Sequence, residues 1–149
     1  KEEVKRVHEW VMEAKEGGGK ILTGGKRIGD SLYEPTVVFN PPADAKLSRE
    51  EIFGPVVAVY TYSSLEDAIE KANAMPGRMQ SAIYTQNVDI AAKAALALDA
   101  TGVMINEATT FRADWMPFGG RGTAGVGLGG IGYSMQEYMQ EKIIVTKVA

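Results

Sequence analysis

The segment from Ser48 to Pro55 contains residue types that could contact a ligand. Two carboxylates, Glu50 and Glu51, precede the aromatic Phe53, and a Gly-Pro pair breaks the chain immediately before an apolar run. Carboxylates accept hydrogen bonds, and an aromatic ring offers a flat apolar face. The segment therefore fits a binding loop at the entrance of a strand. Two solvated acids beside a capping aromatic are the alternative, because glutamate is usually exposed.

Residues 106–120 form a second candidate binding loop. They leave the carboxyl end of a predicted strand, where open α/β sheets bind ligands, and they combine several aromatic side chains with one cation, Arg112. The alternative for Arg112 is a surface pair with Asp114 that holds the loop. Asn106, at the start of the loop, is expected to order it through side-chain to backbone hydrogen bonds.

Glycine dominates the region from Pro117 to Gly132, which holds eight of the seventeen glycines. Gly125-x-Gly127-x-x-Gly130 has the spacing of a dinucleotide-binding loop, in which a strand leads through a tight turn to a helix N-terminus. No strand is expected before these glycines, and little chain follows them. We therefore favour a closely packed surface loop with positive φ angles over a nucleotide-binding loop.

The composition excludes several kinds of chemistry. The 149 residues include no cysteine, so they cannot form disulfides, thiolate metal sites or a cysteine nucleophile. With a single histidine they cannot form a multi-histidine metal site, and a Ser-His-Asp triad is not expected. Sixteen basic and nineteen acidic residues, without a basic block, argue against nucleic acid as a partner. No apolar stretch approaches the roughly 18 residues of a membrane span, so we expect a cytoplasmic location without membrane contact.

Hydrophobic periodicity predicts helices and strands in alternation. The expected order is a helix over 1–16, strands over 20–23, 33–39 and 56–62, a helix through 74, a strand over 81–85, a helix over 88–98, a strand over 102–106, a helix to about 140 and a strand over 143–147. A capping box at residues 63–66 and an N-cap at Asn87 begin two of the helices. The apolar run 56–62 suggests a strand covered on both faces. The order predicts an α/β fold over residues 1–149, a single domain with an open, mostly parallel sheet and flanking helices.

Three motifs in this order and spacing resemble the NAD(P)-dependent aldehyde dehydrogenase superfamily. They are E-E-I-F-G-P-V at 50–56, G-V-M-I-N at 102–106 and P-F-G-G at 117–120, followed by Glu141-Lys142. The resemblance covers essentially the whole chain and about the last third of a family member. It therefore implies the C-terminal part of an aldehyde dehydrogenase catalytic domain.

The resemblance implies a cofactor role for two residues. Glu51 matches the glutamate that accepts hydrogen bonds from the nicotinamide ribose hydroxyls, and Phe53 matches the aromatic that packs beside that ribose and ring. In the family a cysteine thiolate attacks the aldehyde and hydride passes to NAD or NADP. The catalytic cysteine and general-base glutamate lie upstream of the part that is matched. Alone, this chain is expected to be inactive and to bind the cofactor weakly or not at all.

The loop that contains Phe111 and Arg112 resembles the branch of lactaldehyde, semialdehyde and non-phosphorylating glyceraldehyde-3-phosphate dehydrogenases. There the loop lines the aldehyde pocket, so Arg112 would anchor a carboxylate, phosphate or hydroxyl of the substrate and Phe111 would form an apolar wall. One departure lies in the glycine region, where the family usually has a basic residue, a spacer and then Ser-Gly. In this sequence the basic residue, Arg121, stands at a shifted position, and Ala124 occupies the position of the family's serine.

In the family, the last strand joins a sheet across a subunit contact. Residues 143–147 are accordingly expected to be an oligomerisation strand of a homo-oligomer. His8 is expected to be a solvated side chain on the polar side of the first helix. Two other classes remain open: a self-standing, non-catalytic α/β module with a binding or oligomerisation role, and a small nucleotide-binding domain that uses the glycine loop.

Overall fold

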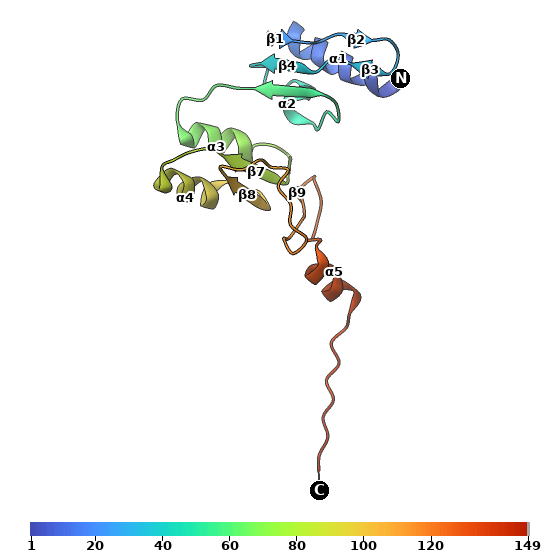
Figure 1. The fold of residues 1–149 in the computed structure, drawn as a ribbon, viewed down its shortest axis with the longest axis vertical. Coiled ribbons are helices and arrows are strands. Elements are labelled where there is room, and N and C mark those ends of the chain that lie inside the picture. Colours follow the sequence, from blue (N-terminus) through green and yellow to red (C-terminus); the bar gives the residue numbers. More distant parts are fainter. Residues whose placement is uncertain (149) are drawn as a thin grey trace. The chain divides into compact units, whose positions relative to one another are not determined.

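The computed structural model describes residues 1–148 and contains two compact units, Lys1–Ala68 and Ile69–Ala149 (Figure 1). In the order of the chain, the elements of the first unit are α1 (Glu2–Glu16), β1 (Lys20–Thr23), β2 (Arg27–Ile28), β3 (Leu32–Tyr33), β4 (Thr36–Phe39), α2 (Lys46–Arg49) and β5 (Val56–Val59). Helix α3 (Leu65–Asn73) begins in the first unit and ends in the second.

Helix α1 supplies much of the core of the first unit. Its apolar positions recur at helical spacing, and Val7, Val11 and Ala14 are buried. Glycines at positions 17–19 end the helix, and the N–H of Gly19 donates to the carbonyl of Ala14 over 2.8 Å. The helix predicted over residues 1–16 is thereby confirmed, starting one residue later.

The main sheet of the first unit has the order β1-β4-β5. β1 and β4 are antiparallel, β4 and β5 are parallel, and β2 pairs with β3 as a separate hairpin. Val38 of β4 is fully buried and belongs to one cluster with Val7, Val11 and Tyr33. The strand predicted at 20–23 is confirmed, and the one predicted at 33–39 is divided between β3 and β4.

Strand β5 is shorter and more exposed than the sequence predicts. It spans Val56–Val59 instead of 56–62, and its residues alternate between half-buried and exposed. Val57 is 59% exposed, because only the face of β5 that carries Val56 and Ala58 packs on the core. The expectation of burial on both faces is therefore wrong for this unit.

The second unit contains a parallel strand pair joined by a helix. In chain order its elements after α3 are β6 (Gly77–Arg78), β7 (Gln80–Ile83), α4 (Val88–Ala97), β8 (Gly102–Ile105), β9 (Arg121–Gly122) and α5 (Ile131–Tyr138). β7 and β8 pair in parallel through α4, and β6 pairs with β9 in antiparallel fashion. The predicted α/β class is confirmed, with parallel pairs and flanking helices in a mixed sheet arrangement.

Two helix starts were predicted from caps, and both helices form. The side chain of Asn87 accepts from the N–H groups of Asp89 and Ile90 at 2.9 and 3.1 Å, which confirms the cap of α4. At α3 the N-cap serine is Ser64, one residue later than predicted. Ser64 Oγ accepts from Asp67 N–H at 3.1 Å, while the Asp67 carboxylate accepts from the N–H of Ser63 at 3.0 Å.

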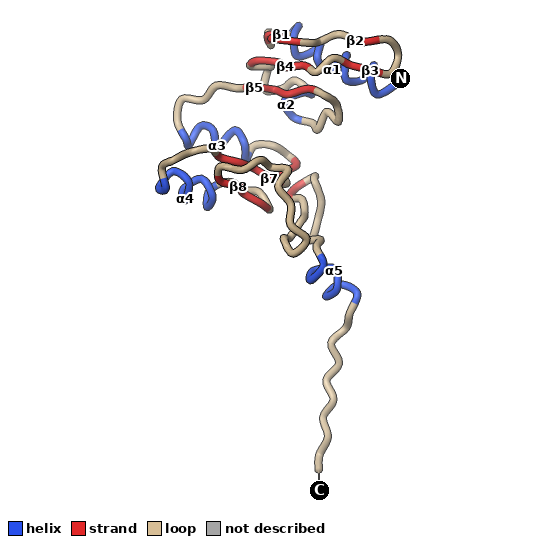
Figure 2. The backbone as a smooth tube through the Cα atoms, viewed as in Figure 1, coloured by secondary structure: helices blue, strands red, loops and turns tan. Residues whose placement is uncertain are grey.

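Residues 139–148 follow α5 without helix or strand (Figure 2). Ile143, Ile144 and Val145 are 89%, 79% and 87% exposed. A strand shared between subunits needs a second chain to pair with, so oligomerisation through residues 143–147 stays a prediction. The expectation of a single domain over residues 1–149 also stays a prediction. No helix among the described residues is long and apolar enough to cross a membrane.

Candidate functional site

The loop at residues 50–55, called the 50–55 loop, connects α2 to β5 in the first unit. Its side chains alternate in direction. Ile52 packs against the core, whereas Glu51 is exposed and Phe53 is 77% exposed. The Glu51 carboxylate forms no hydrogen bond or ion pair with any residue that the structure describes. One loop therefore presents an unpaired acceptor and an aromatic face to the surroundings.

Phe53 has an unusual backbone conformation. Its φ is +45°, in the left-handed region, where the only other residues besides glycine are Asn40 and Asn106 among those described. This conformation costs an L-residue roughly 1–2 kcal/mol. Such strain persists where the surrounding structure enforces it, and it concentrates at functional sites. The sequence carries no signal for it, because phenylalanine is not a residue that favours positive φ.

Gly54 lets the 50–55 loop lie directly on α1. A Cβ atom at Gly54 would be 2.8 Å from Cγ2 of Val7, which is 3% exposed. Beside this contact, Phe53 lines a shallow hollow of about 250 Å³ whose wall includes Leu32 and Tyr33. Burial, followed by the charge of the neighbouring Glu34, raises the pKa of the Tyr33 hydroxyl.

We expect Gly54→Ala to destabilise the chain. The added methyl group meets a β-branched side chain in the core, and overpacking of this kind costs about 1–3 kcal/mol. Urea unfolding followed by circular dichroism measures the shift in midpoint. Gly132→Ala in α5 is the control, because a Cβ there meets no heavy atom within 4 Å. Equal midpoints for Gly54→Ala and the unmodified chain would contradict the packing argument.

Asn106 closes the ends of the parallel strands β7 and β8 in the second unit. Its side-chain oxygen accepts from the N–H of Thr85 at 2.8 Å, and its side-chain nitrogen donates to the Thr85 carbonyl at 2.9 Å. Asn106 itself has a φ of +57°, which asparagine tolerates. The predicted side-chain to backbone hydrogen bonds of Asn106 are confirmed, and both join the start of the loop to Thr85.

Phe111 and Arg112 lie together on the loop after Asn106. Phe111 is 48% exposed, and Arg112 is also exposed. Arg112 Nη1 donates to the carbonyl of Met116 at 3.2 Å, and its guanidinium carbon lies 4.8 Å from the centroid of the Phe118 ring. In the described part of the chain no ion pair joins Arg112 to Asp114, so the surface pair considered from the sequence does not form.

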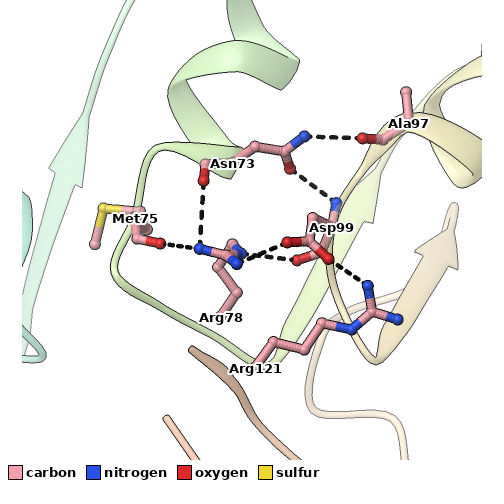
Figure 3. Close-up of polar contacts among 6 residues, drawn as sticks. All are labelled: Asn73, Met75, Arg78, Ala97, Asp99 and Arg121. Atoms are coloured by element: carbon pink, nitrogen blue, oxygen red, sulfur yellow. Dashed lines mark hydrogen bonds and ion pairs between the residues drawn. The ribbon is translucent and has the colours of Figure 1, made fainter. Parts of the chain in front are cut away.

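A cluster of charges that the sequence did not reveal pins the start of the glycine region (Figure 3). Asp99 accepts from Arg78 Nη2 at 2.6 Å through Oδ2 and from Arg121 Nη1 through Oδ1. Arg78 also donates to the carbonyls of Asn73 and Met75. The hydrogen bond from Arg121 is the main cause that holds the pKa of Asp99 below its usual range, with Arg78 contributing.

Because the pKa of Asp99 is lowered, the contribution of this cluster to folding stability depends on pH. A carboxylate whose pKa falls on folding stabilises the folded chain above its unfolded pKa of about 4, and this contribution is lost as the pH falls through the folded pKa. We therefore expect Asp99→Asn to lower the urea midpoint near neutral pH, and this deficit to shrink as the pH is lowered towards about 3. If Asp99→Asn lowered the urea midpoint by the same amount at both pH values, the stabilising role of the Asp99 carboxylate would be contradicted. Asp114→Asn, which removes an exposed carboxylate, is the control.

The glycines pack as a close loop. A Cβ at Gly119 or Gly120 would collide with the backbone of residues 124–127, and Gly122, with a φ of +63°, leaves no room for one beside the Pro76 carbonyl. β9 precedes the fingerprint glycines but is two residues long and antiparallel to β6, unlike the strand of a dinucleotide-binding unit. The geometry supports the packing interpretation.

The four predicted site residues form two pairs, Glu51 with Phe53 in the first unit and Phe111 with Arg112 in the second. Each pair shares one loop.

The expectation for His8 is wrong: it is half-buried, and its Nδ1 lies 3.2 Å from the Tyr33 hydroxyl. The described residues contain no group of three or more histidine, aspartate or glutamate side chains that could hold a metal ion.

Comparison with known proteins identifies the class. Residues 1–144 match the model of the aldehyde dehydrogenase family. The 3-sulfolactaldehyde dehydrogenase of Priestia aryabhattai is 41% identical over 143 residues, which are 96% of this chain and 30% of that protein. The chain therefore belongs to the aldehyde dehydrogenase family.

Solved structures agree with this assignment. Aldehyde dehydrogenase 21 from Physcomitrella patens, in complex with the reaction product succinate, matches with a TM-score of 0.93 and 36% identity over 98% of this chain and 30% of that one. The glyceraldehyde-3-phosphate dehydrogenase GapN from Methanocaldococcus jannaschii, complexed with NADP, matches with a TM-score of 0.84 and 37% identity over 91% and 29%. This chain spans about 30% of the length of these relatives.

Proposed function

We propose that this chain is the C-terminal part of an NAD(P)-dependent aldehyde dehydrogenase, in which it contacts the nicotinamide ribose and forms part of the aldehyde pocket. The observation that carries the proposal is the 50–55 loop. It presents the unpaired Glu51 carboxylate beside Phe53, which is 77% exposed and has a φ of +45°. A loop that stores strain to expose an aromatic ring suits ligand binding better than folding stability.

The residues present fit the nicotinamide end of NAD or NADP. A carboxylate can accept hydrogen bonds from two vicinal ribose hydroxyls, and Glu51 has no competing partner among the described residues. The Phe53 ring can orient a flat ring without competing for its hydrogen bonds. When bound, NAD or NADP supplies the hydride acceptor for the oxidation. Since the chain has no cysteine, the nucleophile comes from residues outside this sequence.

The second loop supports a proposal for the class of aldehyde that is oxidised. Three of the relatives have names or titles that refer to a sulfonate, a dicarboxylate product and a phosphate, each of which carries an anionic group, whereas others are named for the uncharged lactaldehyde. Arg112 is exposed and is steadied by the Met116 carbonyl and the Phe118 ring, so its planar donor fork can bind such a group. Phe111 forms the apolar wall beside it. The substrate proposed here is an aldehyde with an anionic end group.

Aldehyde oxidation tests the proposal through the formation of NADH or NADPH. The 149-residue chain by itself is expected to show no turnover, because it lacks a nucleophilic thiol. The full-length gene product that contains it is expected to oxidise anionic aldehydes. Turnover by the 149 residues alone would contradict the proposal that the nucleophile comes from residues outside this sequence. Absence of turnover in the full-length product would favour a self-standing, non-catalytic module.

A further inference from the structure

Arg6 of α1 reaches the backbone of the 50–55 loop. Its Nη2 donates to the carbonyl oxygen of Ile52 at 2.7 Å. Nη2 and Nε also donate to Glu3 Oε2 at 2.7 and 3.0 Å, and the guanidinium carbon lies 4.7 Å from the centroid of the Trp10 ring. The Arg6 side chain is 29% exposed. An acid and an aromatic ring thus hold the guanidinium in one orientation, with a donor directed at the loop.

The carbonyl that Arg6 binds belongs to the peptide group between Ile52 and Phe53. Peptide groups are planar, so the orientation of this one determines the φ of Phe53. A donor fixed on the Ile52 oxygen resists rotation of the plane towards the negative φ that phenylalanine otherwise prefers. The hydrogen bond from Arg6 therefore acts directly on the strained residue of the loop.

Phe53 differs in this respect from the other two residues in the left-handed region. The Asn40 side chain accepts from the N–H of Thr61 at 3.2 Å, and the Asn106 side chain binds the backbone of Thr85. Both asparagines therefore anchor the positions they occupy with their own side chains. A hydrocarbon ring cannot do so, and the polar anchor of Phe53 has to come from elsewhere in the fold.

We propose that Arg6 is a positioning residue, which holds the 50–55 loop in the conformation that presents Glu51 and Phe53 to the coenzyme. The inference rests on the proposed function and adds a residue that no motif of the sequence marks. Arg6 acts through the Ile52 carbonyl and does not itself touch the coenzyme.

Steady-state kinetics of the full-length gene product test the role. Arg6→Met keeps the aliphatic stem but removes the donors, and it is expected to raise KM for the coenzyme about tenfold, with kcat and KM for the aldehyde almost unchanged. Arg6→Lys retains a charged donor and is expected to restore part of the loss. Lys5→Met is the control, because Lys5 is exposed on the same helix and, among the described residues, its side chain pairs with Glu9 alone.

The outcomes separate this inference from the proposed function. If Glu51→Ala raises KM for the coenzyme and Arg6→Met does not, the positioning role is wrong and the proposed function stands. If neither variant changes KM, both are overturned. Backbone chemical shifts of the isotopically labelled 149-residue chain provide a readout without catalysis. Arg6→Met is expected to change the shifts around Phe53 selectively, and unchanged shifts there would overturn the positioning role.

Discussion

Replacing Arg112 with alanine in the full-length gene product is expected to lower kcat/KM for an anionic aldehyde about 30- to 100-fold. The guanidinium is exposed and already oriented by the Met116 carbonyl at 3.2 Å and by the Phe118 ring, so it can bind an anionic group with little loss of side-chain freedom. Charged hydrogen bonds of this kind contribute about 2–3 kcal/mol. The measurement is the rate of NADH or NADPH formation over a range of aldehyde concentrations.

A neutral aldehyde of similar length serves as the control substrate. Its kcat/KM is expected to change little, because the lost interaction is specific to the anionic end. Arg27→Ala is the control variant, since it removes an exposed arginine from the hairpin strand β2. Equal losses for the neutral and the anionic substrate would assign Arg112 to the folding of its loop instead of to substrate binding.

Replacing Glu51 with alanine is expected to raise KM for NAD or NADP about 30-fold. The two hydroxyls of the ribose would lose the carboxylate that accepts from both of them, a change of about 2 kcal/mol at a partly solvated position. Folding should be unaffected, because the Glu51 side chain is exposed and bonds to no described residue. Initial rates at saturating aldehyde, with the coenzyme concentration varied, measure the effect.

The neighbouring residue provides a matched control for Glu51. Glu50 is an exposed glutamate of the same loop, and Glu50→Ala is expected to leave KM for the coenzyme unchanged. Because both substitutions remove one negative charge from the same place, a general electrostatic effect would act on both alike. Equal changes for the two variants would therefore contradict the specific contact assigned to Glu51.

Features that depend on neighbouring residues could be predicted from the sequence. The N-cap at Asn87, the termination of α1 by glycine and the side-chain contacts of Asn106 each follow from hydrogen bonds or φ angles within a few residues or at one strand end. The N-cap serine of α3 lies one residue later than the sequence predicts, because Ser63 and Ser64 both precede an acid at the required spacing. Propensity alone does not choose between them.

Features that join distant parts of the chain could not be predicted in this way. The contact between Arg6 and Ile52 spans 46 positions, and the contacts of Asp99 with Arg78 and Arg121 span 21 and 22. Neither follows a helical or strand period, and charged residues at such spacings are usually solvated. The sequence also gives no signal for the positive φ of Phe53, because a donor from a distant part of the chain supports this conformation and no local turn residue does.

The outward face of β5 has a practical consequence for recombinant production. Val57 and Tyr62 are 59% and 67% exposed in and after a strand that lies at the edge of its sheet. An apolar strand with a free edge pairs readily with another copy and so promotes deposition into inclusion bodies. Expression of these 149 residues at low temperature, fused to a highly soluble carrier, is therefore the suitable route to material for spectroscopy.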